Sequence, residues 1–196
     1  MSQPILERLR TATKGAHAQL EERVQIEARV IDLQRYAELL EDFLGWYEPL
    51  ESGMRRLAGW GDYGLDLAVR CKSPWLAHDL NALGYSEAQI ATLPRCRDLP
   101  TVETLARGFG CAYVMEGATL GGRHISGLLH ESPVPKEART FFGSYGPRVG
   151  ERWKEFVAAL EAFSDHEGYG DQVVDAARQT FESMESWICR MKGISA

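Results

Sequence analysis

Tyr113-Val-Met-Glu-Gly-Ala-Thr-Leu-Gly-Gly-Arg-His-Ile-Ser-Gly127 is the stretch that decides how this chain folds. The residues around it have the spacing of one long helix, yet the stretch itself contains four glycines. Each glycine inside a helix costs roughly 0.5–1 kcal/mol relative to alanine. Gly117 and Gly121 are four residues apart and therefore share one helical face. Such a bare face admits either a neighbouring helix or a flat, bulky ligand, and the stretch alone does not decide between them.

Length, charge and composition exclude several classes of protein. The 196 residues fit one domain, 1–196, with room for a substantial core. A net charge of -6 without a basic tract argues against nucleic-acid binding. No apolar run approaches the roughly 20 residues that span a bilayer, and the N-terminus lacks the apolar stretch of a secretion signal. The four cysteines form no C-x-x-C pair, so we expect a cytoplasmic protein without a zinc site or a disulfide framework.

Helical periodicity runs through almost the whole chain, and no segment alternates as a strand does, which predicts an all-α fold. The expected helix starts and breaks follow from residues that cap or interrupt helices. They are a first turn at Ser2 and Pro4, caps at Asp32, Ser86, Thr101 and Asp171, a bend or end at Pro49, and a short helix from Ser73 to Gly84. The helix capped by Thr101 is expected to run to about Leu129 and to contain the glycine stretch.

Two polar residues interrupt the apolar stripe of the first helix. Arg10 and His17 are seven residues apart, two helical turns, on the stripe formed by residues 6, 10, 13, 17, 20 and 24. Glu21 follows His17 by four residues, and carboxylates so placed orient metal-bound histidines. Arg10 is a permanent cation for a carboxylate. Heme has an iron at its centre and two propionates at one edge, so this helix could bind both. The alternatives are a buried structural histidine and a solvated arginine.

The histidines do not match the sequence patterns of di-iron or zinc sites. None has a glutamate three residues before it, as in di-iron bundles, and no H-E-x-x-H pattern is present. His124 follows Gly121 by three residues and is the main rival to His17 as a ligand.

Four segments resemble heme oxygenases. Leu9-Arg-Thr-Ala-Thr-Lys-Gly-Ala-His-Ala-Gln-Leu-Glu21 resembles their proximal helix, and Tyr113–Gly122 resembles their distal helix. The segment from Phe141 to Phe156 is similar to a third marker of the bacterial branch, and the last helix, Val173–Trp187, is also similar to that branch. The resemblance implies an all-α bundle with heme sandwiched between a proximal and a distal helix.

The resemblance also implies roles for particular residues. His17 would bind the heme iron, Glu21 would orient His17, and Gly117 and Gly121 would form the distal wall. The residues implied at the heme propionates are Arg10, Tyr113, Arg148 and Arg152. A basic residue at the Arg10 position accompanies cleavage at the α-meso carbon in this family. Animal members carry an aspartate directly after the first distal glycine, where this chain has Ala118. The resemblance therefore does not identify the group that anchors water on the distal side of the heme.

The implied reaction converts heme to biliverdin IXα, carbon monoxide and Fe2+. Heme b would be both substrate and prosthetic group, O2 the oxidant, and a ferredoxin, a flavoprotein reductase or ascorbate the electron donor. A bacteriophytochrome is an expected recipient of biliverdin, and the chain is expected to be a monomer. Two alternatives stay open: a non-catalytic heme carrier or sensor on the same fold, and a helical thiaminase- or quinone-synthesis-like protein that binds no heme.

Overall fold

The computed structural model describes residues 3–165 and 168–191, and every regular element in these ranges is a helix. The all-α prediction is therefore confirmed. The α-helices are α1 (Ile5–Val24), α2 (Ile26–Val30), α3 (Leu33–Arg55), α4 (Ser73–Ala82), α5 (Glu87–Thr92), α6 (Leu105–His130), α7 (Thr140–Gly143), α8 (Val149–Ser164) and α9 (Tyr169–Met191). Short 3-10 helices are η1 (Trp60–Tyr63), η2 (Ala68–Arg70), η3 (Lys136–Ala138) and η4 (Gly146–Arg148). None of the described helices is both long and apolar enough to cross a bilayer.

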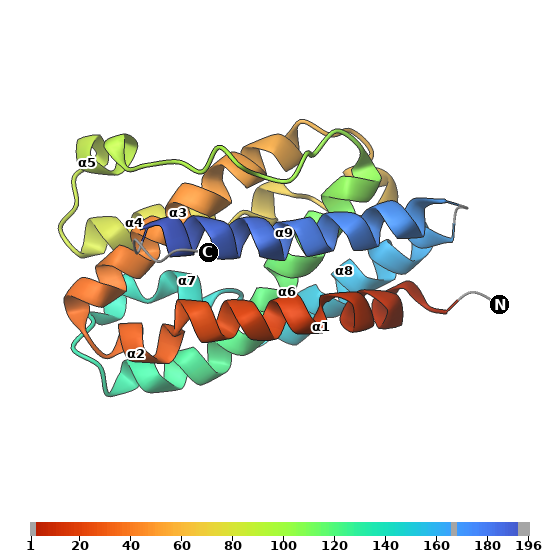
Figure 1. Ribbon diagram of the computed structural model, residues 1–196. Coiled ribbons are helices and arrows are strands. Elements are labelled where there is room, and N and C mark those ends of the chain that lie inside the picture. The colour runs from red at the N-terminus through yellow and green to blue at the C-terminus, as the bar shows by residue number, and fades with distance from the viewer. Residues whose placement is uncertain (1–2, 166–167, 192–196) are drawn as a thin grey trace.

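The last helix joins the two helices that carry the sequence motifs. Both α1 and α6 pack extensively along α9, whereas α6 meets α2 at its C-terminal part and α8 along its side. In Figure 1, α1 and α9 run beside each other across the front of the molecule, and α6 lies behind them. Packing against α9 thus fixes the positions of α1 and α6 relative to each other.

The buried stripe of α1 differs from the predicted one. Its buried residues are Ile5, Leu9, Thr13, Leu20 and Val24. Arg10 and His17 lie beside this stripe and are exposed. The helix begins after Pro4, while Ser2 lies outside the described residues. Gln25 takes a left-handed conformation and separates α1 from α2, a break that the periodicity did not indicate.

The predicted caps are partly confirmed. The side chains of Asp32 and Ser86 accept hydrogen bonds from backbone N–H groups at the starts of α3 and α5. The prediction of Thr101 as the cap of α6 is wrong, because Thr104 accepts from the backbone N–H of Arg107 and the helix begins at Leu105. Asp171 lies within the first turn of α9 and pairs with Arg8 of α1.

Pro49 does not end its helix. α3 continues past it to Arg55. A proline inside a helix leaves the carbonyl four residues earlier without its N–H partner. That carbonyl, on Gly45, accepts instead from the backbone N–H of Cys96 at 2.8 Å. A contact from the distant segment 93–104 therefore satisfies the group that the proline leaves free.

Candidate functional site

One face of α6 is covered at one end and open further along. Gly110, Gly117 and Gly121 share this face, because they are separated by seven and four residues. A side chain on Gly110 would overlap the Val173 carbonyl of α9. Within the described residues, the nearest atom to a Cβ on Gly117 is in the Trp153 ring at 3.9 Å, and nothing lies within 4 Å of a Cβ on Gly121. Close helix packing thus explains Gly110, but no packing partner among the described residues explains Gly117 and Gly121.

Gly122 has a different role from its neighbour. A Cβ on Gly122 would lie 2.7 Å from the carbonyl oxygen of Phe142 in α7. The Ser126 hydroxyl donates to the same carbonyl at 3.1 Å. The alternative of tight packing through small residues is therefore correct for Gly122, which lets α7 approach the back of α6.

Two contacts to neighbouring residues of α9 relate His17 to the glycine helix. Thr180 contacts Cys111 of α6, with 3.3 Å between hydroxyl oxygen and sulfur. The next residue, Phe181, contacts His17 of α1, with ring centroids 5.5 Å apart in an edge-to-face arrangement. His17 and Cys111 therefore lie at the same level along α9.

A third contact joins the C-terminal part of α6 to α2, the helix that follows α1. His124 of α6 and Glu27 of α2 are 2.7 Å apart between Nε2 and Oε1. The part of α6 from Cys111 to His124 therefore passes the segment that begins at His17 and ends at Glu27. That part is about 20 Å long at the rise of an α-helix and contains Gly117 and Gly121.

His17 is exposed and lies beside a carboxylate, unlike a core residue. Its side chain is 55% exposed, and Nδ1 lies 3.5 Å from Oε2 of Glu21. With Nδ1 directed to the carboxylate, Nε2 is the nitrogen left to bind a metal. The predicted pairing of His17 with Glu21 is present, and the alternative of a buried structural histidine does not fit this exposure.

The rival histidine is engaged elsewhere. His124 uses Nε2 in its contact with Glu27. It therefore ties α6 to α2, and it would have to leave a carboxylate partner before binding a metal through that nitrogen.

The four predicted propionate partners fall into two groups. Arg10 is exposed on the His17 side of α1 and makes no ion pair within the described residues. Tyr113 is half-buried, one turn before Gly117, with its ring centroid 6.1 Å from that of Trp153. Arg148 pairs with Glu151 at 3.0 Å, and Arg152 pairs with Glu155 at 3.1 Å. Within the described residues the guanidinium of Arg10 is left available, whereas Arg148 and Arg152 each pair with a carboxylate, and Glu155 is shared with Arg70.

Sequence reasoning missed two aromatic residues of the site. Trp153 of α8 is the nearest neighbour of a Cβ built on Gly117, and Phe181 of α9 contacts His17. Both had the helical spacing of core residues, so no signal in the sequence separated them from the rest of the core. Leu120, next to Gly121, is 44% exposed.

The residues present suit a heme. Among the residues that the structure describes, the site offers an imidazole whose Nε2 has no partner, a helix face without a covering side chain at Gly121, and a cation at Arg10 without an ion pair. A macrocycle needs an axial ligand on one side, room on the other, and cations for its propionates. Ala118 is exposed and carries no polar group, so the side chain of this residue cannot anchor water.

Comparison with known proteins agrees with this geometry. The sequence model of the family described as heme oxygenase matches residues 3–190. No curated protein matches the chain. The NO- and CO-bound heme oxygenase of Neisseria meningitidis is similar over 100% of this chain and 95% of its own, with a TM-score of 0.83 and 16% identity. The heme oxygenase of Leptospira interrogans is similar over 96% of this chain and 100% of its own, with a TM-score of 0.73 and 15% identity. At these identities the structural likeness shows the fold.

Proposed function

Because the chain belongs to the heme oxygenase family of heme-degrading oxidoreductases, we propose that it cleaves heme at the α-meso carbon to give biliverdin IXα, carbon monoxide and Fe2+. The observation that carries this proposal is the glycine face of α6, which is covered by α9 at Gly110 and open at Gly117 and Gly121. The open part passes the segment that begins at His17. A planar molecule bound by His17 would fill the space beside Gly121 that no side chain of residues 3–165 and 168–191 is shown to occupy.

Each residue of the site has a distinct task in this proposal. His17 binds the iron through Nε2, and Glu21 holds the imidazole by Nδ1 so that Nε2 faces the substrate. Bound heme supplies both the iron that activates O2 and the carbon that is oxidised. The backbone at Gly117 and Gly121 would leave room for a diatomic molecule beside the heme. Trp153 and Phe181 supply apolar contacts at the two sides of the site.

The finer assignments are proposals that the site supports. Arg10 and Tyr113 are the proposed propionate partners, and Arg148 and Arg152 would join them by exchanging Glu151 and Glu155 for a propionate. The substrate is heme b, and electrons come from a ferredoxin, a flavoprotein reductase or, in an assay, ascorbate. We also propose a cytoplasmic monomer of one domain that passes biliverdin to a bacteriophytochrome.

A single-turnover assay tests the proposed function. The protein is loaded with hemin and exposed to air and ascorbate. We expect the Soret band to disappear while biliverdin absorbance grows, with the IXα isomer dominant in chromatography of the product. A heme carrier or sensor would keep its Soret band under the same conditions, and a protein of the helical class without heme would show none on loading. A product mixture dominated by the β or δ isomer would contradict the α-meso assignment.

Arg10 should affect where heme is cleaved without affecting how the chain folds. Its guanidinium is exposed and makes no ion pair within residues 3–165 and 168–191, so Arg10→Leu should change the free energy of unfolding by less than about 0.5 kcal/mol. Loss of a propionate contact should let heme rotate in the site and raise the share of isomers other than IXα. Chromatography of the isomers measures this.

Two variants control for the loss of charge. Arg10→Lys keeps a cation and should keep IXα dominant. Arg35→Leu removes an exposed arginine from α3 and should leave the isomer composition unchanged. An unchanged composition in Arg10→Leu would remove Arg10 from the propionate site.

A further inference from the structure

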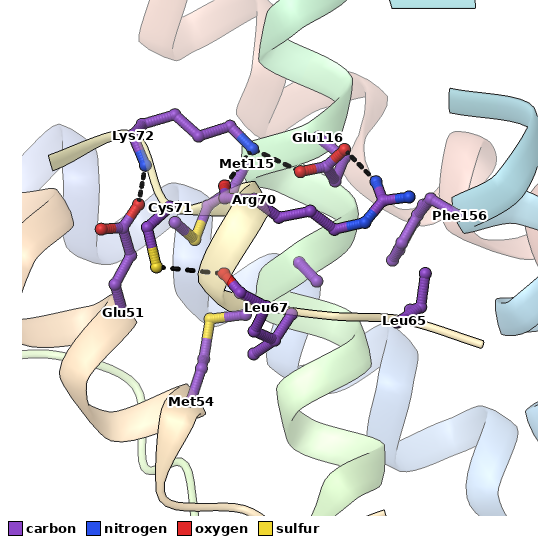
Figure 2. A pocket seen from close by; sticks show the side chains of 11 residues that line it. Glu51, Met54, Leu65, Leu67, Arg70, Cys71, Lys72, Met115, Glu116 and Phe156 are labelled. Carbon is purple, nitrogen blue, oxygen red and sulfur yellow. Dashed lines mark hydrogen bonds and ion pairs between the residues drawn. The ribbon is translucent and has the colours of Figure 1, made fainter. Parts of the chain in front are cut away.

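A group of buried charges lies behind the glycine face of α6. Glu116 directly precedes Gly117, and its side chain is on the other side of the helix, with residue exposure of 3%. Figure 2 shows Arg70 and Lys72 reaching this carboxylate from two directions. Both cations come from the segment between η1 and α4, more than 40 residues earlier in the chain.

Three donors hold the Glu116 carboxylate. Oε2 accepts from Nη1 of Arg70 at 2.8 Å. Oε1 accepts from Nζ of Lys72 and, at 2.9 Å, from the Tyr145 hydroxyl. Lys72 Nζ also donates to the Arg70 carbonyl at 2.6 Å and to the Tyr145 hydroxyl at 2.8 Å, so the three protons of its ammonium group all have partners.

Glu51 supplies a second carboxylate, which with Glu116 balances the charges of Arg70 and Lys72. It accepts from the backbone N–H groups of Lys72 and Ser73 and from the Ser73 hydroxyl. Burial raises the pKa of Glu51 and lowers the pKa of Lys72, while Glu116 beside Lys72 acts in the opposite direction on the ammonium. We call Glu51, Arg70, Lys72, Glu116 and Tyr145 the Glu116 cluster. It contains two cations and two carboxylates.

The cluster connects α6 to several other elements. Arg70 Nη2 donates to Glu155 of α8 at 2.8 Å, and Tyr145 belongs to the loop between α7 and η4. A cavity of about 20 Å³ adjoins the cluster between Cys71 and Phe156, enough for about one water molecule. The Glu116 side of α6 is thus fixed to α3, α4 and α8 through directed polar contacts.

The open side of α6 has no comparable contacts. On that side α6 packs against α9 at Gly110, but at Gly121 no atom of the described residues lies within 4 Å of a Cβ position. The distance of the Gly117–Gly121 part of α6 from the substrate therefore depends on contacts elsewhere on the helix, including those on its Glu116 side. Apolar residues of similar volume stabilise a core as well as a buried ion pair does or better, so stability alone does not account for the charges. A carboxylate bound by three donors fixes direction and distance in a way that apolar packing does not.

We propose that Glu116 is a positioning residue, which, held by Arg70, Lys72 and Tyr145, sets how closely Gly117 and Gly121 approach the bound macrocycle and thereby which meso carbon is cleaved. The effect on cleavage rests on the proposed function, whereas the effect on the position of α6 does not.

Two variants loosen the cluster to different degrees. Glu116→Gln keeps the shape of the side chain and removes its charge, and Tyr145→Phe removes one hydroxyl. Asp42→Asn is the matched control, because Asp42 forms a buried ion pair with Arg29 at 2.8 Å that joins α2 to α3. If Glu116→Gln does not fold, Tyr145→Phe carries the test.

Amide hydrogen exchange of the protein without heme tests the positioning. In Glu116→Gln, amides 117–121 should exchange about tenfold faster than in the wild-type chain, as expected when a charged hydrogen bond that resists local opening is lost. Tyr145→Phe should show a smaller increase in the same segment. Asp42→Asn should leave this segment unchanged. Equal acceleration in Asp42→Asn, or none in Glu116→Gln, would overturn the proposal, since either result would make the cluster a source of general stability only.

Product isomers test the consequence for cleavage. Glu116→Gln should raise the share of isomers other than IXα several-fold, while Asp42→Asn keeps the wild-type composition. Faster exchange with an unchanged composition would overturn the role in specificity. If wild-type protein makes no biliverdin, the proposed function fails, and hydrogen exchange still decides whether Glu116 positions α6.

Discussion

His17→Ala should lose heme turnover by at least about 100-fold, more than the roughly 10–100-fold typical of losing only the partner of a metal ligand. His17 is the histidine whose Nε2 is left free by the contact of Nδ1 with Glu21. The free energy of unfolding should change by less than about 0.5 kcal/mol, because the side chain is half exposed. Titration with hemin, followed at the Soret band, measures binding, and single turnover with ascorbate measures activity.

Three comparisons make the result specific to ligation. Added imidazole should restore part of the Soret band in His17→Ala by occupying the vacated position. Glu21→Ala should bind heme more weakly while keeping the histidine-bound spectrum, because only the orientation of the ring is lost. His124→Ala should keep heme bound, since its Nε2 contacts Glu27. Tight heme binding and full turnover in His17→Ala would refute the assignment of His17 as ligand.

Alanine at Gly110 and alanine at Gly121 should change the stability of the protein without heme in opposite directions. Gly121→Ala places its methyl group where nothing lies within 4 Å and should stabilise α6 by about 0.5–1 kcal/mol. Gly110→Ala would force Val173 and Ala176 of α9 away and should destabilise by about 1–3 kcal/mol or more. Urea denaturation of the two variants measures the difference.

Heme binding should depend on the open face at Gly121 and not on Gly122, which packs against α7. Gly121→Leu should retain the stability of the wild-type chain without heme and weaken heme binding at least tenfold, because its side chain would occupy the open face. Gly122→Ala serves as the control: it should destabilise the chain through the Phe142 carbonyl at 2.7 Å, with heme affinity of the folded protein kept. Undiminished heme binding in Gly121→Leu would show that heme does not lie against this face.

Local sequence patterns determined the helices and their chemistry. Apolar periodicity indicated an all-α chain, and the caps at Asp32 and Ser86 were predictable because a cap bonds to backbone only three residues away. The pairing of His17 with Glu21 was predictable for a similar reason, since residues four apart in a helix are neighbours. The cost of glycines in α6 was also visible, because helix propensity belongs to the residue itself.

Only the tertiary structure decided which glycines serve packing and which are left open. A Cβ on Gly110 or Gly122 would meet a carbonyl of α9 or α7, whereas one on Gly121 would meet no atom of the described residues, and their sequence context did not distinguish them. Pro49 continues α3 because a backbone N–H from Cys96 reaches the carbonyl of Gly45. Glu116 is buried because Arg70 and Lys72, more than 40 residues earlier in the chain, bind its carboxylate. Each of these outcomes depends on contacts between residues far apart in the chain. Periodicity and propensity describe a residue and its near neighbours, so only the packed molecule shows where the surface of α6 is left open.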